Sequence, residues 1–235
     1  MIDQHYTYLL VNFGAVVVPF LFTFHSKIKF YKKWKEAAIA IALPMILFLP
    51  WDMYFTRLGV WGFNPDYTLG VRIVNLPLEE ILFFICIPYC CLFTYHSLTT
   101  LLFNQQKYKP LKVFTYTLSA VIIFIALIFY DKYYTFSSFF LLGLCLVWSA
   151  NYFADKMVVF FLSYLILLVG FFAVNGILTG TGLEKPVVWY NNNENMGLRT
   201  LTIPVEDFFY GMLLILLNII LFEKFSEKEH VAKEK

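Results

Sequence analysis

Two pairs of adjacent acidic residues stand at the edges of apolar stretches, each pair two residues after a proline. The four acids are Glu79, Glu80, Glu206 and Asp207. Desolvation favours the protonated form of a carboxyl in an apolar site, and a second carboxylate nearby strengthens that effect. Such a group is a proton donor at neutral pH. We therefore predict that these four residues are catalytic and supply general acid and base chemistry.

A structural interpretation of the acid pairs stays open. Proline suits the first position of a helix, and an acid in the first turn meets the positive end of the helix dipole. One acid per helix would then be a cap, but this explains two adjacent acids in both places less readily. Neighbouring helix positions are about 100° apart, so one acid of each pair can face a cavity while the other holds it in place.

The acid pairs belong to an internal repeat with an offset of 127 residues, the separation of Gly70 from Gly197. Both copies carry a glycine, an arginine, the proline, the acid pair and an aromatic residue at identical spacing. Further pairs follow upstream with a drifting offset: Trp61 with Trp189, Asn64 with Asn192, Asp52 with Asn175, Thr56 with Thr179, and Gly59 with Gly182. This ordered series of matches indicates a duplicated unit.

Several repeat residues have candidate supporting roles. Arg72 and Arg199 either pair with one acid of each set and keep it ionised, or anchor the chain at a membrane interface. Asp52 either exchanges a proton or faces lipid headgroups, whereas its counterpart Asn175 can only form hydrogen bonds. The two repeats are therefore expected to be chemically unequal. The supporting set is completed by Trp61, Asn64, Phe83 and Tyr210.

The composition predicts a membrane protein. Of the 235 residues, 60% are hydrophobic and 14% charged, whereas soluble domains average roughly 45–50% apolar and about 25% charged residues. No basic stripe with interleaved aromatic residues suggests nucleic acid as a partner. No dinucleotide motif, phosphate loop or metal-ligand spacing occurs, so we predict neither a flavin, a nicotinamide nor a metal.

Seven segments are long and apolar enough to be membrane-spanning helices, which need about 20 residues to cross ~30 Å. They are 6–24, 37–55, 76–95, 113–130, 136–153, 157–178 and 204–222. Aromatic residues near their ends, Tyr8 and Tyr134 among them, are interpreted as interfacial anchors. The chain start has no basic region or cleavage site, so the first helix is expected to stay.

The repeat and the segments together predict an all-α protein in which two parallel three-helix repeats are joined by one inverting helix (3+1+3). The expected units are residues 1–103, 104–132 and 133–223, with a charged tail at 224–235. Most of the 18 lysines and arginines fall on one side. The positive-inside rule then predicts a multi-pass protein of the cell membrane with its amino terminus outside and its carboxyl tail in the cytoplasm. The predicted cytoplasmic cations include Lys107, Lys228, Lys233 and Lys235. The site is expected between the third and seventh helices, in the outer half of the membrane.

At these residues the chain resembles the integral-membrane lycopene cyclases, the heterodimer-type carotenoid cyclases, with both polypeptides fused in one chain. The resemblance rests on residues 51–54, 59–65, 75–84, 87–89 and 204–207. It implies a redox-neutral isomerisation of lycopene, or a related acyclic carotenoid, to γ- and β-carotene. It further implies the lipid bilayer and other membrane enzymes of the carotenoid pathway as partners. On this basis we expect Glu79 and Glu206 to face the substrate, with Glu80 and Asp207 as their partners.

Two other classes of membrane protein have seven helices or parallel repeats. A seven-helix retinal photoreceptor needs a lysine in the middle of its last helix, and residues 204–222 contain none. A 3+1+3 transporter or binding protein for a small molecule would also have parallel repeats. A sugar transporter should have a polar cavity, however, whereas this chain offers mostly Phe, Leu and Ile. The transporter stays as the alternative, and substrate uptake against pigment formation discriminates the two.

Overall fold

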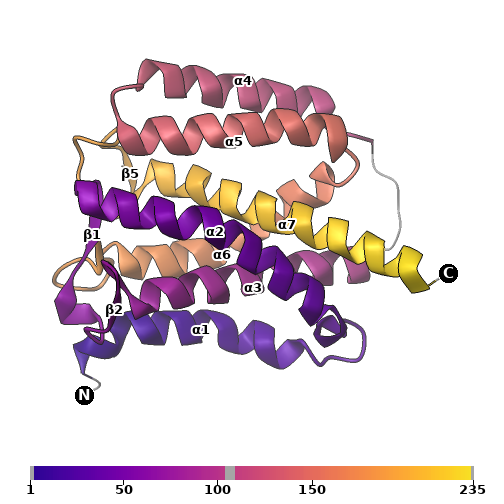
Figure 1. The fold of residues 1–235 in the computed structure, drawn as a ribbon, viewed down its shortest axis with the longest axis horizontal. Helices are drawn as coiled ribbons and strands as arrows, with labels where there is room; N and C mark the ends of the chain where they lie inside the picture. The colour runs from indigo at the N-terminus through magenta and orange to yellow at the C-terminus, as the bar shows by residue number, and fades with distance from the viewer. Residues whose placement is uncertain (1–2, 104–108, 234–235) are drawn as a thin grey trace.

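Seven α-helices make up most of the part of the chain that the computed structural model describes, residues 3–103 and 109–233, with side chains up to residue 227. Figure 1 shows them as a bundle of roughly aligned rods. They are α1 (Thr7–Phe22), α2 (Trp34–Leu58), α3 (Leu78–Leu101), α4 (Lys112–Ile128), α5 (Tyr133–Tyr152), α6 (Met157–Leu178) and α7 (Val205–Lys233). Short 3-10 turns lie at Gln4–Tyr6, Phe30–Lys33 and Pro65–Tyr67.

Six of the described helices are long and apolar enough to cross a membrane, so the molecule is an all-α protein of the membrane type. The helix α4 is the exception, because it has 17 residues and ends at Ile128 rather than at the expected residue 130. The chain turns there, and the Lys132 amide donates to the Phe129 carbonyl at 3.0 Å. All seven predicted segments are therefore helices, but α4 is too short to count among those that are long enough to cross a membrane.

Each acid pair follows a small β-hairpin, and the two hairpins are alike. In the first, β2 (Arg72–Ile73) pairs with β3 (Leu76–Pro77), and in the second, β5 (Arg199–Thr200) pairs with β6 (Ile203–Pro204). Val74 and Leu201, at equivalent turn positions, both adopt φ of 59°. Pro77 and Pro204 belong to the last strand of each hairpin, so neither occupies the first helical position that the sequence suggested. The hairpins fix where α3 and α7 begin.

A third strand pair joins the two halves of the chain. The strand β1 (Trp61–Phe63) pairs antiparallel with β4 (Val188–Tyr190), and Trp61 lies opposite Tyr190. Residues directly opposite in an antiparallel pair share one face, while their neighbours point to the other face. Trp189 accordingly lies over Gly62, where a Cβ would come within 2.4 Å of the indole ring. Glycine at position 62 thus makes room for this ring.

The helix packing repeats in the two halves. The first helix of each half packs against the third, α1 on α3 and α5 on α7. The middle helix of each half packs against the third helix of the other half, α2 on α7 and α6 on α3, and α3 also contacts α7. The helix α4 packs on α5 at the edge of the bundle (Figure 1). The arrangement places α3 and α7, with their acid pairs, in the centre.

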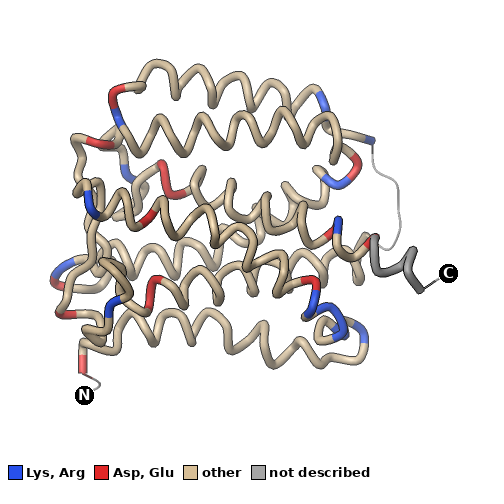
Figure 2. The backbone as a smooth tube through the Cα atoms, in the orientation of Figure 1, with Lys and Arg blue, Asp and Glu red and all other residues tan. Residues whose placement is uncertain are grey.

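Charged residues gather at the two ends of the bundle, and the helix middles are largely free of them (Figure 2). The hairpins and the β1–β4 pair lie at the end where α1 begins, and the described carboxyl-terminal helix runs out at the opposite end (Figure 1). Lys107 and Lys235 of the predicted cytoplasmic cations lie outside the described residues, as do the side chains of Lys228 and Lys233.

Candidate active site

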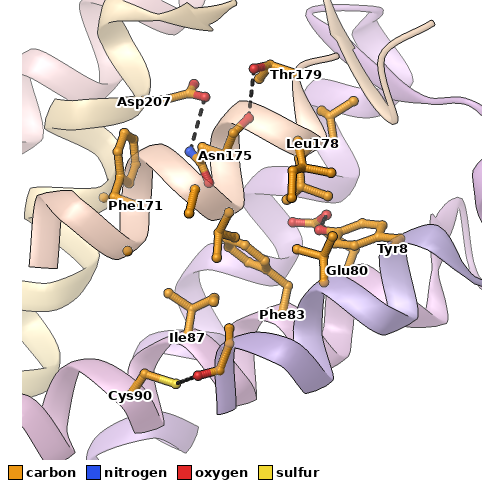
Figure 3. A pocket seen from close by; sticks show the side chains of 18 of the residues that line it. Tyr8, Glu80, Phe83, Ile87, Cys90, Phe171, Asn175, Leu178, Thr179 and Asp207 are labelled. Atoms are coloured by element: carbon orange, nitrogen blue, oxygen red, sulfur yellow. Dashed lines mark hydrogen bonds between the residues drawn. The ribbon is translucent and has the colours of Figure 1, made fainter. Parts of the chain in front are cut away.

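A cavity of about 880 Å³ lies between the two halves of the bundle. Its wall consists of residues from α1, α3, α6 and α7, with parts of α2, α5 and the β1–β4 pair. Ligand sites commonly have roughly 300–1,000 Å³, so the cavity is large enough for a substantial apolar group. Polar side chains meet at its inner end, and Figure 3 shows several of them with the aliphatic and aromatic residues around them.

Glu80, the second acid of its pair, lines this cavity. It is 8% exposed, and the Tyr8 hydroxyl on α1 donates to its Oε2. The Glu80 carboxyl also interacts electrostatically with those of Asp52 and Asp207. Three carboxyl groups thus meet in a buried space where like charges are costly, which is an arrangement suited to holding and moving a proton.

Asp52 enters the same cluster from α2. Its Oδ1 accepts hydrogen bonds from the Trp61 indole Nε1 at 2.5 Å and from the Thr56 hydroxyl at 3.3 Å. Its Oδ2 is buried and has no hydrogen-bond partner. A buried polar atom without a partner is uncommon and calls for a functional or structural explanation. Because Asp52 is 2% exposed, the interpretation as a helix-end acid facing lipid headgroups is wrong.

Asp207, the second acid of the other pair, also lines the cavity. The Tyr134 hydroxyl donates to its Oδ1 at 2.6 Å, and the Tyr190 hydroxyl donates to its Oδ2 at 3.0 Å. The Asn175 amide donates to Oδ2 as well, at 3.4 Å. Burial, with the Asp207 carboxyl beside it, raises the pKa of Tyr190 well above its ordinary value. Tyr190 therefore keeps its proton and remains a donor.

The first acids of the pairs serve a different purpose. Glu79 accepts from the Leu69 amide at 2.6 Å, and Glu206 accepts from the Met196 amide at 2.8 Å and from the Thr135 hydroxyl at 2.6 Å. Both glutamates are fully buried, and neither belongs to the cavity wall. Glu79 and Glu206, the acids expected to face the substrate, thus lie outside the wall of this cavity, whereas Glu80 and Asp207 line it. Each of the two glutamates outside the wall holds the loop that leads into its hairpin.

The arginines do not join the acids. Arg199 donates to the Thr202 carbonyl at 2.8 Å and to Asn192 Oδ1 at 3.1 Å, and its guanidinium lies 5.9 Å from the Tyr190 ring centre. Arg72 is exposed in β2. Among the described residues, neither arginine forms an ion pair with a carboxylate. Asn64 is likewise a turn residue, whose Oδ1 accepts from the Asp66 amide.

Aromatic rings surround the polar cluster. The Trp61 ring centre lies 5.0 Å from that of Tyr134 and 6.2 Å from that of Tyr210. Tyr134 in turn stacks on Tyr190 at 5.8 Å. Phe83 and Tyr210, the repeated aromatic residues, both line the cavity. Aromatic faces attract cations, by about 2 kcal/mol where water is excluded, so this wall can stabilise a positive charge beside the acids.

Sequence reasoning missed three tyrosines of the site. Tyr8 and Tyr134, interpreted as interfacial anchors, are 0% and 2% exposed. Their hydroxyls donate hydrogen bonds to Glu80 and to Asp207, respectively. Their separation of 126 residues, close to the offset of the acid pairs, was the available signal. Tyr190 was hidden because the repeat pairs Trp61 with Trp189, whereas the strand register places Trp61 opposite Tyr190. Trp189 is 43% exposed and lies outside the cavity wall.

The sequence model of a known family, lycopene cyclase, matches residues 5–98 and residues 131–225. The chain belongs to the lycopene cyclase family. The two matched stretches hold α1 to α3 and α5 to α7 nearly whole, and α4 lies between them. Both acid pairs, both hairpins and every polar residue of the cavity described above lie within the matched stretches.

Curated relatives of the chain are much longer fungal proteins. A bifunctional lycopene cyclase/phytoene synthase of Aspergillus niger is 30% identical over 112 residues, which are 46% of this chain and 17% of the relative. Another, of Pyrenophora tritici-repentis, is 32% identical over 97 residues, 41% of this chain and 15% of the relative. The matched part thus spans less than a fifth of either relative. No solved structure matches the chain significantly.

Proposed function

We propose that this protein is a carotenoid end-group cyclase that converts lycopene to γ- and β-carotene by acid–base isomerisation in a cavity within the membrane. The family and the names of its relatives support this proposal. The observation that carries it is the placement of Glu80 and Asp207, both buried in the wall of one largely apolar cavity. An acyclic hydrocarbon fits such a wall, and the acids at its inner end offer it a proton donor and a proton acceptor.

Glu80 is the proposed proton donor, with Asp52 as the group that shares its proton. The donor delivers a proton to C2 of the acyclic end group, which leaves a cation at C1. The Tyr8 hydroxyl holds Glu80 in position, and Trp61 holds Asp52. Asp52 suits this role because its Oδ2 has no other hydrogen-bond partner. The counterpart Asn175 carries no acidic proton, so the second half cannot perform the same step in the same way.

Asp207 is the proposed base. The C5=C6 double bond attacks the cation at C1, a bond forms between C1 and C6, and Asp207 accepts the proton that C6 releases. One proton is added and one is lost, so the reaction is redox-neutral. Donors reach both oxygens of Asp207, from Tyr134 and Tyr190, which fixes this carboxylate beside the developing cation. Glu80 and Asp207 line the same cavity, which supports return of the proton between turnovers.

We further propose that all seven helices cross the membrane, with α4 as the single crossing between two parallel repeats. In support, both hairpins lie at one end of the molecule, and β1 and β4 pair there across the halves. The lysines of residues 27–35 lie at the other end, which we assign to the cytoplasm of a cell-membrane protein. The acid cluster then lies in the outer half of the membrane.

The test is expression of the chain in a host that accumulates lycopene, followed by chromatography of the pigments. The proposal expects γ- and β-carotene with the intact chain, and unchanged lycopene with a Glu80→Gln variant present in equal amount in the membrane. If the intact, membrane-inserted chain leaves lycopene unchanged, the proposed reaction is wrong. Uptake of a small polar solute by the same cells would instead favour a transporter.

A further inference from the structure

The cavity reaches the surface of the bundle between α1 and α6. At its inner end, the wall residues Tyr8, Asp52 and Asp207 are at most 4% exposed. At its outer end, wall residues of both helices are exposed: Leu10 and Gly14 on α1, and Ile166, Gly170, Ala173 and Ile177 on α6. Asp3 and Gln4, which precede α1, are exposed wall residues as well. The cavity therefore leads to the acids both through a passage from the side of the bundle between α1 and α6 and from the end where α1 begins.

Two glycines lie on the faces that border this passage. On α1, Thr7, Val11 and Gly14 follow one another at spacings of three or four residues, which places them on one face of the helix. On α6, Leu167, Gly170 and Val174 do the same. A Cβ added at Gly14 or at Gly170 would meet no atom within 4 Å. Absence of a side chain at these two positions thus keeps the passage wide.

The opening lies in the middle of two apolar helices. The span that contains α1, Gln4–Phe22, and the helix α6 are both long and apolar enough to cross a membrane. Gly14 and Gly170 lie several residues from either end of their helices. If these helices cross a bilayer, this part of the opening faces its hydrocarbon core, in which a long polyene dissolves. Most of the side chains that line the cavity are aliphatic or aromatic, and Figure 3 shows several of them. Such a wall favours an apolar occupant.

Building on the proposed cyclase function, we infer that the passage between α1 and α6 is a lateral opening through which a long acyclic polyene inserts one end group from the bilayer. Gly14 and Gly170 set its width and are specificity-determining residues. The rest of the polyene stays between the helices and in the lipid. A molecule with two end groups is then cyclised one end at a time, and it must leave and turn around before its second end can react.

The experiment uses bound lycopene as a readout that does not depend on turnover. The Glu80→Gln chain is purified from lycopene-accumulating cells, and the pigment per protein is measured. The substitutions Gly14→Trp and Gly170→Trp are each expected to lower the amount of bound lycopene about tenfold, which corresponds to a loss of about 1.4 kcal/mol of binding free energy. Matched controls are Val17→Trp and Val169→Trp, which add bulk on the same helices at exposed positions outside the cavity wall. The controls should retain the pigment.

A second measurement blocks the passage after folding. A Gly14→Cys variant without the native cysteines is reacted with a bulky apolar disulfide-forming reagent, and conversion of added lycopene is followed before and after reduction. Reversible loss at position 14, absent from a Val17→Cys control, supports the inference. Equal lycopene binding and equal conversion in blocked and control variants would overturn the inference about the passage and leave the proposed function standing. Failure of the unblocked chain to convert lycopene at all would overturn the proposed function, and the inference with it.

Discussion

Replacing each of the two glutamates at the start of α3 by glutamine, one at a time, separates the roles that the structure gives them. Glu79 and Glu80 are sequence neighbours, and each becomes glutamine with little change in volume. Glu80 lines the cavity, whereas Glu79 holds the Leu69 amide at 2.6 Å outside the cavity wall. We predict that Glu80→Gln abolishes most cyclisation and that Glu79→Gln preserves it. Sequence reasoning alone assigned the substrate-facing role to the opposite residue.

The two substitutions should affect different quantities, because Glu80→Gln removes a general acid and Glu79→Gln changes a buried hydrogen-bonding group. Loss of a positioned general acid typically costs about 10²–10⁴-fold in rate, equivalent to about 2.7–5.4 kcal/mol of transition-state stabilisation. Glutamine at position 80 still offers an oxygen to the Tyr8 hydroxyl, so the fold should persist. Glutamine at position 79 still accepts from Leu69, but it places an amide nitrogen where Oε2 is buried without a partner. Such a buried donor costs about 1–3 kcal/mol of stability.

The assay measures β-carotene formed per amount of membrane-inserted protein, with thermal stability of the purified protein measured in parallel. Glu79→Gln should lower the melting temperature and keep the activity per protein within about threefold. Glu80→Gln should keep the melting temperature and lose the activity. Comparable losses of activity per protein in both variants would refute the assignment, and so would full activity of Glu80→Gln.

Three more predictions concern Asp52, the electron balance of the reaction and the arrangement of the chain in the membrane. Asp52→Asn makes the two halves chemically alike and should lower the rate about tenfold to a hundredfold, because asparagine cannot share the proton of Glu80; wild-type activity would exclude that role. Purified enzyme should not consume reduced nicotinamide in proportion to the rings formed, and one equivalent oxidised per ring would contradict an isomerisation. Cysteine at Asp66 or Asn193 should react with an impermeant thiol reagent in intact cells, and cysteine at Lys112 only after lysis. Labelling of Asp66 and Asn193 from opposite sides would contradict parallel repeats.

The elements and their duplication could be predicted from the sequence because both follow from local patterns. Apolar runs of helical length give the seven helices, and identical spacing around Pro77 and Pro204 gives the duplicated acid pairs. The two hairpins that precede these pairs were not predicted, because each strand has only two residues. The central position of α3 and α7 also follows, since each acid pair must lie inside the protein rather than in lipid.

The choice between neighbouring acids depends on a tertiary contact and could not be made from spacing. Spacing shows only that Glu79 and Glu80 point in different directions. Which of them faces the cavity depends on where the loop before the hairpin places the Leu69 amide. Glu79 on α3 accepts from this amide, and the neighbouring acid is thereby turned toward Tyr8.

The unequal polar partners of the two halves also arise in three dimensions. Trp61 and Trp189 match in sequence, yet the strand register places Trp61 and Tyr190 on the cavity side. Trp61 then donates to Asp52, and Tyr190 donates to Asp207. A cross-strand pair between segments more than a hundred residues apart has no local signature, so the repeat, which matches Trp61 with Trp189, did not reveal Tyr190.

Solvent hydrogen incorporated into the product tests the central claim, protonation of the polyene by a carboxylic acid, most directly. Purified enzyme equilibrated in deuterated water, in excess over lycopene, is allowed a single turnover, and the cyclic product is examined by mass spectrometry and NMR. Protonation by Glu80 predicts one deuterium at C2 of each new ring. Rings formed without deuterium at C2 would contradict the account.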